Sequence, residues 1–193
     1  MLYRLIIAVG MYASSAFCQS EMQMLAAAFS GRWTITDKSE PSTTYPNGLT
    51  RMGEEDWHTL AGGIPLIEEY RSKAPDGAEE FDTAAFWWDQ SAHKYAGLFC
   101  ARTVDEGCAP FAIVWGKSTH KAKGAQNATV SGIPQGEVVM SGEYRQNGKR
   151  QVWREVFVFS TADNFVQTLF MGDDANNLQR VAIISAARVK GAR

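Results

Sequence analysis

The stretch Gly31-Arg32-Trp33-Thr34-Ile35-Thr36 decides the fold class of this 193-residue chain. Trp33 and Ile35 alternate with the polar residues Arg32, Thr34 and Thr36. This period of two residues is typical of a β-strand with one buried face and one solvated face. We therefore expect the first strand of the domain to begin at Gly31.

Strand-like segments continue from this stretch to the C-terminus and are separated by turn signals. Asn147-Gly148 is the strongest short hairpin signal in the chain. No strand–helix–strand alternation, internal repeat or linker interrupts the series, and 21–29 suits one short helix. The sequence predicts an all-β, single up-and-down antiparallel β-barrel of about ten strands with a short N-terminal helix. The expected strands are 31–36, 51–60, 64–72, 81–88, 94–103, 110–116, 127–133, 137–146, 150–160, 165–171 and 178–189.

Residues 1–18 have the pattern of a secretory signal peptide, with cleavage expected between residues 16 and 20. Arg4 precedes an apolar run that is too short to span a bilayer as a helix, and small residues follow it. The mature chain, 21–193, is then one barrel domain that is secreted or periplasmic. Lipoprotein anchoring through Cys18 is the alternative, but Phe17 before it fits a lipoprotein cleavage site poorly.

Composition narrows the range of partners. Nineteen Lys and Arg residues against 21 Asp and Glu residues leave a net charge of −2, and no basic block suggests nucleic-acid binding. No later segment is apolar enough for a transmembrane helix. The oligomeric state is left open by the sequence.

Cys100 and Cys108 flank the predicted tip of a hairpin and can lie opposite each other on its two strands. Export would place them in an oxidising compartment, so we expect a disulfide between them. Two free thiols at the barrel wall are the alternative.

Several short motifs together resemble a known family. They are Gly31-x-Trp33, a Gly62-Gly63 pair before a strand that carries Glu68-Glu69, Trp88-Asp89 followed by Tyr95, and a closing strand that ends near Arg188. This arrangement resembles an uncharacterised bacterial family of lipocalin-like (calycin-type) β-barrel proteins of unknown function. The resemblance covers roughly the whole mature chain.

The resemblance implies a structural pair at the base of the barrel. In calycins, the Trp of Gly-x-Trp packs under an Arg near the final strand, which implies that Trp33 lies against Arg188 or, as a second choice, Arg180. Gly31, Trp33 and Arg188 are therefore expected to be structural. A related barrel family binds haem through a His near the C-terminal end, but this chain has no His after His120. No cofactor is expected.

Aromatic residues are the main candidates for ligand contacts. Glu155 shares one face of its predicted strand with Trp153, Phe157 and Phe159, so it would be a polar group among aromatic rings. The alternative is that the aromatic rings only pack the core. The candidate ligand-binding residues are Trp57, Trp88, Tyr95, Trp115, Trp153, Glu155 and Phe157.

No metal site or catalytic motif is predicted. Glu54, Glu55 and Asp56 precede His58, but neighbouring residues alternate sides of a strand and do not converge on one ion. We interpret this segment as a solvated acidic strand. There is no nucleophile elbow, zinc-protease motif or phosphate loop.

The leading functional hypothesis is a non-catalytic exported barrel that binds a small apolar molecule. One alternative is a cavity isomerase, cyclase or hydrolase that uses Glu155, Glu68 or Glu69. The other is a structural or interaction module of the cell envelope with an exposed aromatic edge at Trp87 or Trp88.

Overall fold

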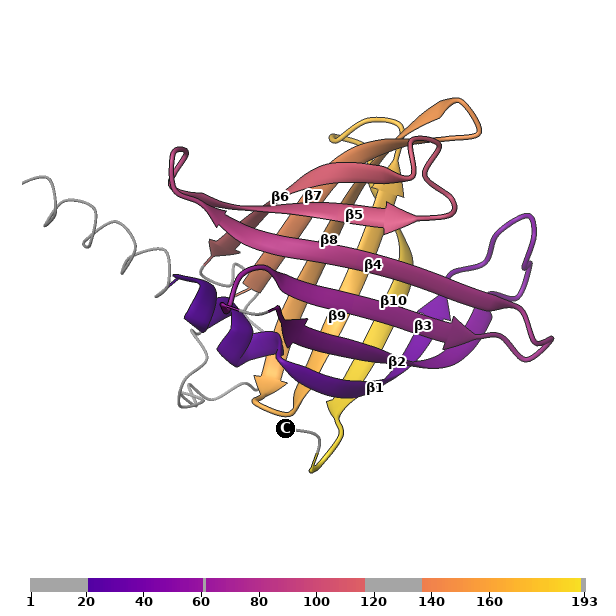
Figure 1. The fold of residues 1–193 in the computed structure, drawn as a ribbon. Helices are drawn as coiled ribbons and strands as arrows, with labels where there is room; N and C mark the ends of the chain where they lie inside the picture. Colours follow the sequence, from indigo (N-terminus) through magenta and orange to yellow (C-terminus); the bar gives the residue numbers. More distant parts are fainter. Residues whose placement is uncertain (1–20, 61, 117–136, 192–193) are drawn as a thin grey trace, which may run out of the picture.

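The computed structural model describes residues 21–60, 62–116 and 137–191. The expected signal peptide with Cys18, the strand at 127–133 and His120 lie outside these residues. Within them, the chain forms ten strands and a short helix at 21–29 (Figure 1). The strands are β1 (Gly31–Ser39), β2 (Leu49–Thr59), β3 (Leu66–Lys73), β4 (Glu79–Asp89), β5 (Lys94–Ala101), β6 (Cys108–Gly116), β7 (Glu137–Gln146), β8 (Lys149–Thr161), β9 (Asn164–Gly172) and β10 (Gln179–Arg188).

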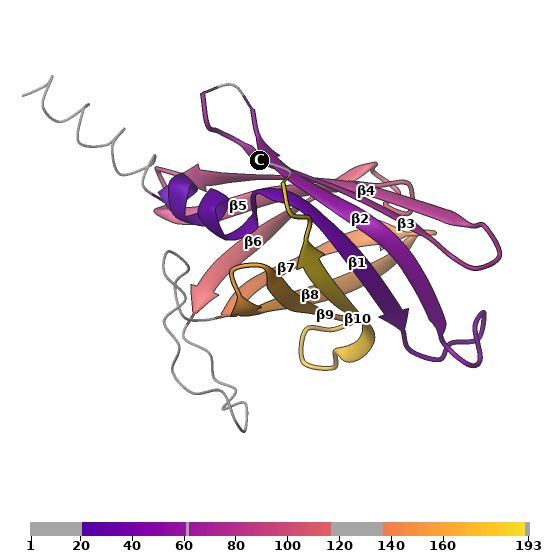
Figure 2. The same cartoon turned by 90° about the horizontal axis from the view of Figure 1, so that it is seen from below.

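The strands form one closed antiparallel barrel in the order β1-β10-β9-β8-β7-β6-β5-β4-β3-β2. Each strand pairs with its neighbours in sequence, and β1 pairs with β10 to close the ring. Figure 2 shows β1 and β10 side by side at this closure. The predicted up-and-down barrel with an N-terminal helix is therefore confirmed.

The hairpin predicted at Asn147-Gly148 is also confirmed. Gln146 pairs with Lys149, and the two turn residues have φ angles of 53° and 74°. Positive φ at both central positions is the signature of a type I′ turn, for which Asn-Gly is the preferred sequence.

The barrel has one packed end and one open end. The helix contributes Leu25 and Phe29, both fully buried, to a core that includes Trp33 and Trp57. Figure 1 shows this helix at the left end of the barrel, away from the loop between β1 and β2. At this packed end, Phe29 stacks on Trp57 with ring centroids 4.4 Å apart, and the two rings belong to an aromatic layer that also includes Phe157.

Two glycines allow the wall to curve. At Gly53 in β2, a Cβ atom would lie 2.0 Å from the carbonyl oxygen of Arg71 in β3. At Gly97 in β5, a Cβ atom would lie 2.2 Å from the ring of its cross-strand partner Phe111. A glycine inside a strand has no side chain, so the backbone or a ring of the neighbouring strand can approach it closely and the barrel wall can bend.

Candidate functional site

A cavity of about 600 Å³ occupies the barrel interior toward the open end. A ten-stranded barrel has a wider lumen than an eight-stranded one, in which side chains nearly fill the interior. The cavity wall combines aromatic rings with acidic side chains. Its aromatic members are Tyr45, Tyr70, Phe86, Phe99, Phe111 and Trp153, and its acidic members are Asp37, Glu40, Glu68, Glu80, Asp82 and Glu155.

Strand alternation explains why these carboxyl groups face inward. On β3, Leu66, Tyr70 and Ser72 are buried, and Glu68 shares their parity, whereas Glu69 and Arg71 are exposed. On β8, Glu155 shares its parity with Trp153 and Phe157. β3 and β8 stand five positions apart in the ten-strand ring, so Glu68 and Glu155 extend from opposite walls.

The acidic stretch of β2 is divided between the two faces of the wall. Glu54 is exposed and pairs with Arg32 at 2.6 Å. Glu55 is only 1% exposed, and its Oε2 accepts a hydrogen bond of 2.9 Å from Trp57 Nε1. The interpretation of this segment as a solvated acidic strand is therefore wrong for Glu55. The sequence signal for this inward position is the shared parity of Glu55 with Trp57 on β2.

Burial raises the pKa of each interior carboxyl. The pKa of Glu155 rises to about 8, first through desolvation and then through the charges of Glu55 and Asp82, while a hydrogen bond from Gln167 limits the rise. Desolvation is also the main cause of the elevated pKa of Glu68, with Glu55 and Glu155 contributing. The pKa of Asp82 rises to about 7 through desolvation and then the charge of Glu80. Burial therefore shifts the ionisation of these carboxyls toward neutral pH, well above the ordinary range of a carboxyl group.

Glu55 behaves in the same way. Its pKa rises to about 7 because desolvation outweighs the opposing effect of the hydrogen bond from Trp57. The interior carboxyls therefore form one coupled acidic set, in which the ionisation of one member disfavours that of the next. We call Glu55, Glu68, Asp82 and Glu155 the acidic cluster.

Polar contacts organise the open end of the cavity. Tyr70 Oη donates a 3.2 Å hydrogen bond to Asp37 Oδ2, and Arg51 lies 3.6 Å from the same oxygen. Arg51 also lies 3.5 Å from Glu80, and Arg180 pairs with Glu40 at 2.5 Å. Both cationic side chains that line the cavity are thus engaged by carboxylates near its mouth.

Two buried acceptors on the cavity wall are left without a hydrogen bond. Asp37 Oδ1 and Gln167 Oε1 have no partner within the part of the chain that the structure describes, and each residue is 5% exposed. Both residues line the cavity. Buried acceptors without partners are costly, so a donor on a bound molecule would be favoured here.

The structure brings two of the seven candidate ligand residues, Trp153 and Glu155, to this cavity. Trp57 and Phe157 pack instead in the aromatic layer against Phe29. Strand alternation determines that a side chain points inward, but its height along the barrel axis depends on strand register. Inward residues of one strand are therefore divided between the packed end and the cavity.

The other three candidates lie in or against the packed core. Trp88 forms an edge-to-face pair with Tyr95, and Trp115 also packs against Tyr95. The Tyr95 hydroxyl lies 2.8 Å from the Glu21 carboxylate at the start of the helix. None of the three is among the residues that line the cavity at the open end. Trp87 has the opposite parity on β4 and borders a second pocket of about 690 Å³, which is more open than the barrel cavity.

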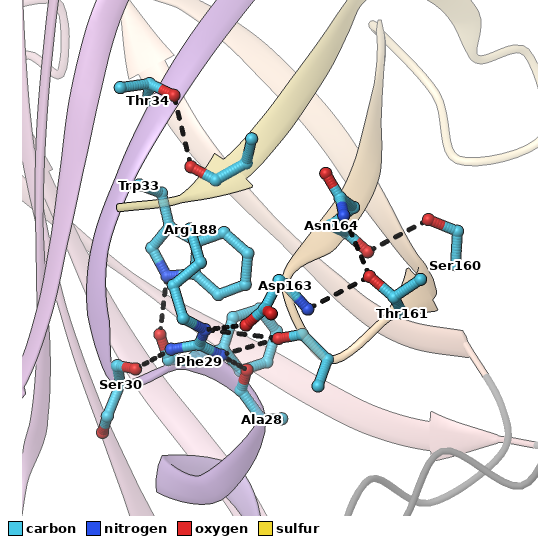
Figure 3. A network of polar contacts seen from close by, with 12 residues as sticks. Ala28, Phe29, Ser30, Trp33, Thr34, Ser160, Thr161, Asp163, Asn164 and Arg188 are labelled. Carbon is cyan, nitrogen blue, oxygen red and sulfur yellow. Dashed lines mark hydrogen bonds and ion pairs between the residues drawn. The ribbon is translucent and has the colours of Figure 1, made fainter. Parts of the chain in front are cut away.

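Arg188 joins three elements at the base of the barrel (Figure 3). Its guanidinium carbon lies 4.1 Å from the centre of the Trp33 ring. The guanidinium also donates hydrogen bonds to the carbonyls of Ala28, Ser30 and Ala162. The first two carbonyls lie at the helix C-terminus, where unsatisfied acceptors and the helix dipole favour a cation.

Trp33 also binds the end of the helix directly, because its indole Nε1 donates a 2.8 Å hydrogen bond to the carbonyl oxygen of Phe29. Arg180, the second choice for the partner of Trp33, lies instead at the mouth with Glu40. Gly31 has a φ of 123°, which favours glycine at this position.

The cysteine pair is bonded. Cys100 of β5 and Cys108 of β6 are directly opposed and form a disulfide. The bond lies at the hairpin whose tip packs against the β7–β8 turn, where Asp105 accepts hydrogen bonds from the backbone of Asn147 and Gly148.

The described residues contain no group of three or more His, Cys, Asp and Glu side chains placed to hold a metal ion. His58 lies 4.0 Å from Asp56, and both side chains are substantially exposed. Among the helices of residues 21–191 that the structure describes, none is long and apolar enough to cross a membrane.

Solved structures are similar to this chain at low sequence identity. One is an S-type phycobiliprotein lyase from Guillardia theta, with 9% identity, a TM-score of 0.50, and coverage of 84% of this chain and 89% of the lyase. Another is a de novo designed fluorescence-activating β-barrel, with 11% identity, a TM-score of 0.41, and coverage of 85% and 97%. No protein-family model and no curated protein sequence matches the chain.

Proposed function

We propose that this chain is an exported, lipocalin-like barrel that binds one small molecule in its interior cavity. The observation that carries this proposal is the cavity of about 600 Å³ beyond the packed aromatic layer. This volume is within the range of small-molecule sites, which combine apolar walls with a few fixed polar groups. Phe86, Phe99 and Phe111 supply apolar surface, and Asp37 and Gln167 supply acceptors.

Export is proposed from the signal-peptide pattern of residues 1–18 and is supported by the Cys100–Cys108 disulfide. Structural disulfides persist in oxidising compartments and are uncommon in the cytosol.

The proposal is tested by native mass spectrometry of the protein expressed with its own leader and purified without denaturant. Titration with the neutral dye N-phenyl-1-naphthylamine, followed by dye and tryptophan fluorescence, provides a second readout. We expect saturable binding of one molecule per chain. Absence of both an added mass and a saturable fluorescence change would contradict the proposal.

A neighbouring pair of alanines supplies the matched control. Ala84 lines the cavity, whereas Ala85 has the opposite parity on β4. Ala84→Phe should weaken dye binding at least about tenfold, and Ala85→Phe should leave it unchanged. Equal effects of the two substitutions would place the dye outside the cavity.

A second candidate function is acid–base catalysis on the bound molecule. It is favoured by Glu155, whose pKa of about 8 lies in the range useful for a general acid or base. Product analysis by mass spectrometry with any molecule that co-purifies tests it, since Glu155→Gln should abolish turnover even when the ligand saturates the cavity. Unchanged turnover in that variant would contradict a catalytic role for Glu155.

A further inference from the structure

The acidic cluster lacks a cationic partner within the protein. None of Glu55, Glu68, Asp82 and Glu155 forms an ion pair with any residue in the described ranges. Arg51 and Arg180 line the same cavity but are paired with Asp37, Glu80 and Glu40 at its mouth. A bound cation would therefore stabilise the ionised form of these carboxyls, whereas a bound anion would oppose their ionisation.

The unpartnered acceptors point to the same ligand chemistry. Asp37 Oδ1 and Gln167 Oε1 are at least nine-tenths buried in residues that line the cavity. Both are acceptors, so the complementary group on a ligand is a hydrogen-bond donor. Ammonium and guanidinium groups combine several donors with positive charge, and hydrogen bonds from them to carboxylates are stronger than neutral ones.

The surroundings of the carboxyls favour an organic cation over a metal ion. Glu68 and Glu155 belong to strands on opposite walls, and the described residues hold no compact metal-binding group. Phe86, Phe99, Phe111 and Trp153 line the space around these carboxyls. Aromatic faces attract cations and also cover apolar carbon.

We propose that the cavity selects an organic cation with an apolar body, whose ammonium or guanidinium group contacts Glu68 and Glu155. This inference rests on the proposed function and names the class of its ligand. The expected ligand is then an amphiphilic amine or guanidine, and not the uncharged apolar molecule of the leading hypothesis from the sequence. The aromatic wall holds the apolar body of the ligand, and the acidic cluster holds its charged end.

Three probes with one common body test the inference by isothermal titration calorimetry at pH 7.5. They are 4-phenylbutylamine, 4-phenylbutanol and 5-phenylpentanoate, which share a phenyl ring on a chain of four methylenes and differ only in the charge and chemistry of the head group. We expect the amine to bind at least about tenfold more tightly than the alcohol and the carboxylate to bind weakest. An alcohol that binds as tightly as the amine would overturn the inference.

Single Glu→Gln substitutions distinguish the effect of the cavity carboxyls on amine binding from the effect of surface charge. Glu68→Gln should weaken amine binding about tenfold and leave alcohol binding unchanged, and Glu155→Gln should do the same. Glu69→Gln removes the neighbouring exposed carboxylate of β3 and should have no effect. If Glu69→Gln and Glu68→Gln weaken amine binding equally, the effect is one of net charge and the inference fails.

Proton release on binding distinguishes a ligand that ionises the carboxyls from one that only occupies the cavity. A bound cation stabilises ionised carboxyls, so amine binding should release protons, and the apparent binding enthalpy should differ between buffers of different ionisation enthalpy. Alcohol binding should show no such difference. The other titratable or charged groups that face the cluster are Asp37, Arg51, Tyr70, Glu80 and Tyr144.

The outcomes distinguish the inference from the proposed function. Binding of N-phenyl-1-naphthylamine without any preference for the amine would contradict the cation inference and leave the proposed binding function intact. Failure of the dye and all three probes to bind would contradict both.

Discussion

At the residue scale, Arg188 has the most connected side chain at the base of the barrel. It contacts the Trp33 ring, two carbonyls at the helix C-terminus and the Ala162 carbonyl in the β8–β9 turn. It also lies 3.3 Å from Asp163. The side chain is mostly buried, so each of these acceptors would lose its partner in a poorly hydrated site if Arg188 were shortened.

Arg188→Ala is therefore expected to lower the free energy of unfolding by about 2–4 kcal/mol, as measured by urea denaturation. Arg180→Ala is the control, because its salt bridge with Glu40 is half-exposed and contributes about 1 kcal/mol or less. Similar losses in the two variants would contradict the role assigned to Arg188.

Gly97 shows how a missing side chain shapes the cavity. Its Cβ position is filled by the ring of Phe111, which lines the cavity. Gly97→Ala should lower the free energy of unfolding by about 1–3 kcal/mol in thermal or urea denaturation, because the ring must move. Ala96→Ser, at the adjacent position of opposite parity, should change it by less than about 0.5 kcal/mol. A neutral Gly97→Ala would show that the Phe111 ring moves without cost.

At the element scale, the β5–β6 hairpin is stabilised by covalent and polar contacts. The disulfide joins its directly opposed strands, and Asp105 at its tip binds the backbone of the β7–β8 turn. Val104 is buried in a small cluster with Ala101 and Ala109 beneath the same tip. These contacts fix the rim of the cavity near Gln146, which lines it.

Replacing both cysteines by serine should lower the free energy of unfolding by roughly 2–3 kcal/mol, the value expected for a short closed loop. The barrel should still form, because the strand register does not depend on the bond. Thermal denaturation with and without reductant checks the size of the effect. Reductant should destabilise the wild-type protein by a similar amount and leave the double variant unchanged; a large effect on the double variant would contradict this interpretation.

At the scale of the whole molecule, the acidic cluster links stability to pH. The pKa values of Glu55 and Asp82 rise to about 7, and that of Glu155 rises to about 8. In the unfolded chain, carboxyls ionise near pH 4 to 4.5. Between these limits the folded protein binds more protons than the unfolded chain, so the free energy of unfolding falls as pH rises.

We expect the melting temperature to decrease from pH 5 to pH 8, between the unfolded and folded pKa values of these carboxyls, and to change less above that range. Glu68→Gln should flatten this decrease and raise stability at pH 9 relative to the wild-type protein, since it removes one ionising group from the cluster. Glu69→Gln should keep the wild-type slope. Melting curves at intervals of one pH unit test this, and a wild-type melting temperature that rises from pH 5 to pH 9 would contradict it.

Much of the fold was predictable because its signals are local. Alternation around Trp33 and the Asn147-Gly148 turn determine strand and hairpin through backbone geometry alone. The parity of Glu155 with Trp153 and Phe157 likewise predicted an inward carboxylate. The Trp33–Arg188 pair came from the family resemblance, since no local pattern links two residues that far apart in the sequence.

The sequence by itself determined the strands, their alternating faces and the antiparallel hairpins, because each depends on neighbouring residues. The tertiary structure alone decided which inward residues meet at the same height in the barrel. Trp57 and Phe157 came to lie in the packed layer, whereas Glu68, Asp82 and Glu155 came to face one cavity from separate strands. The physical reason is that strand register and ring closure set height along the barrel axis, and both depend on contacts between distant segments.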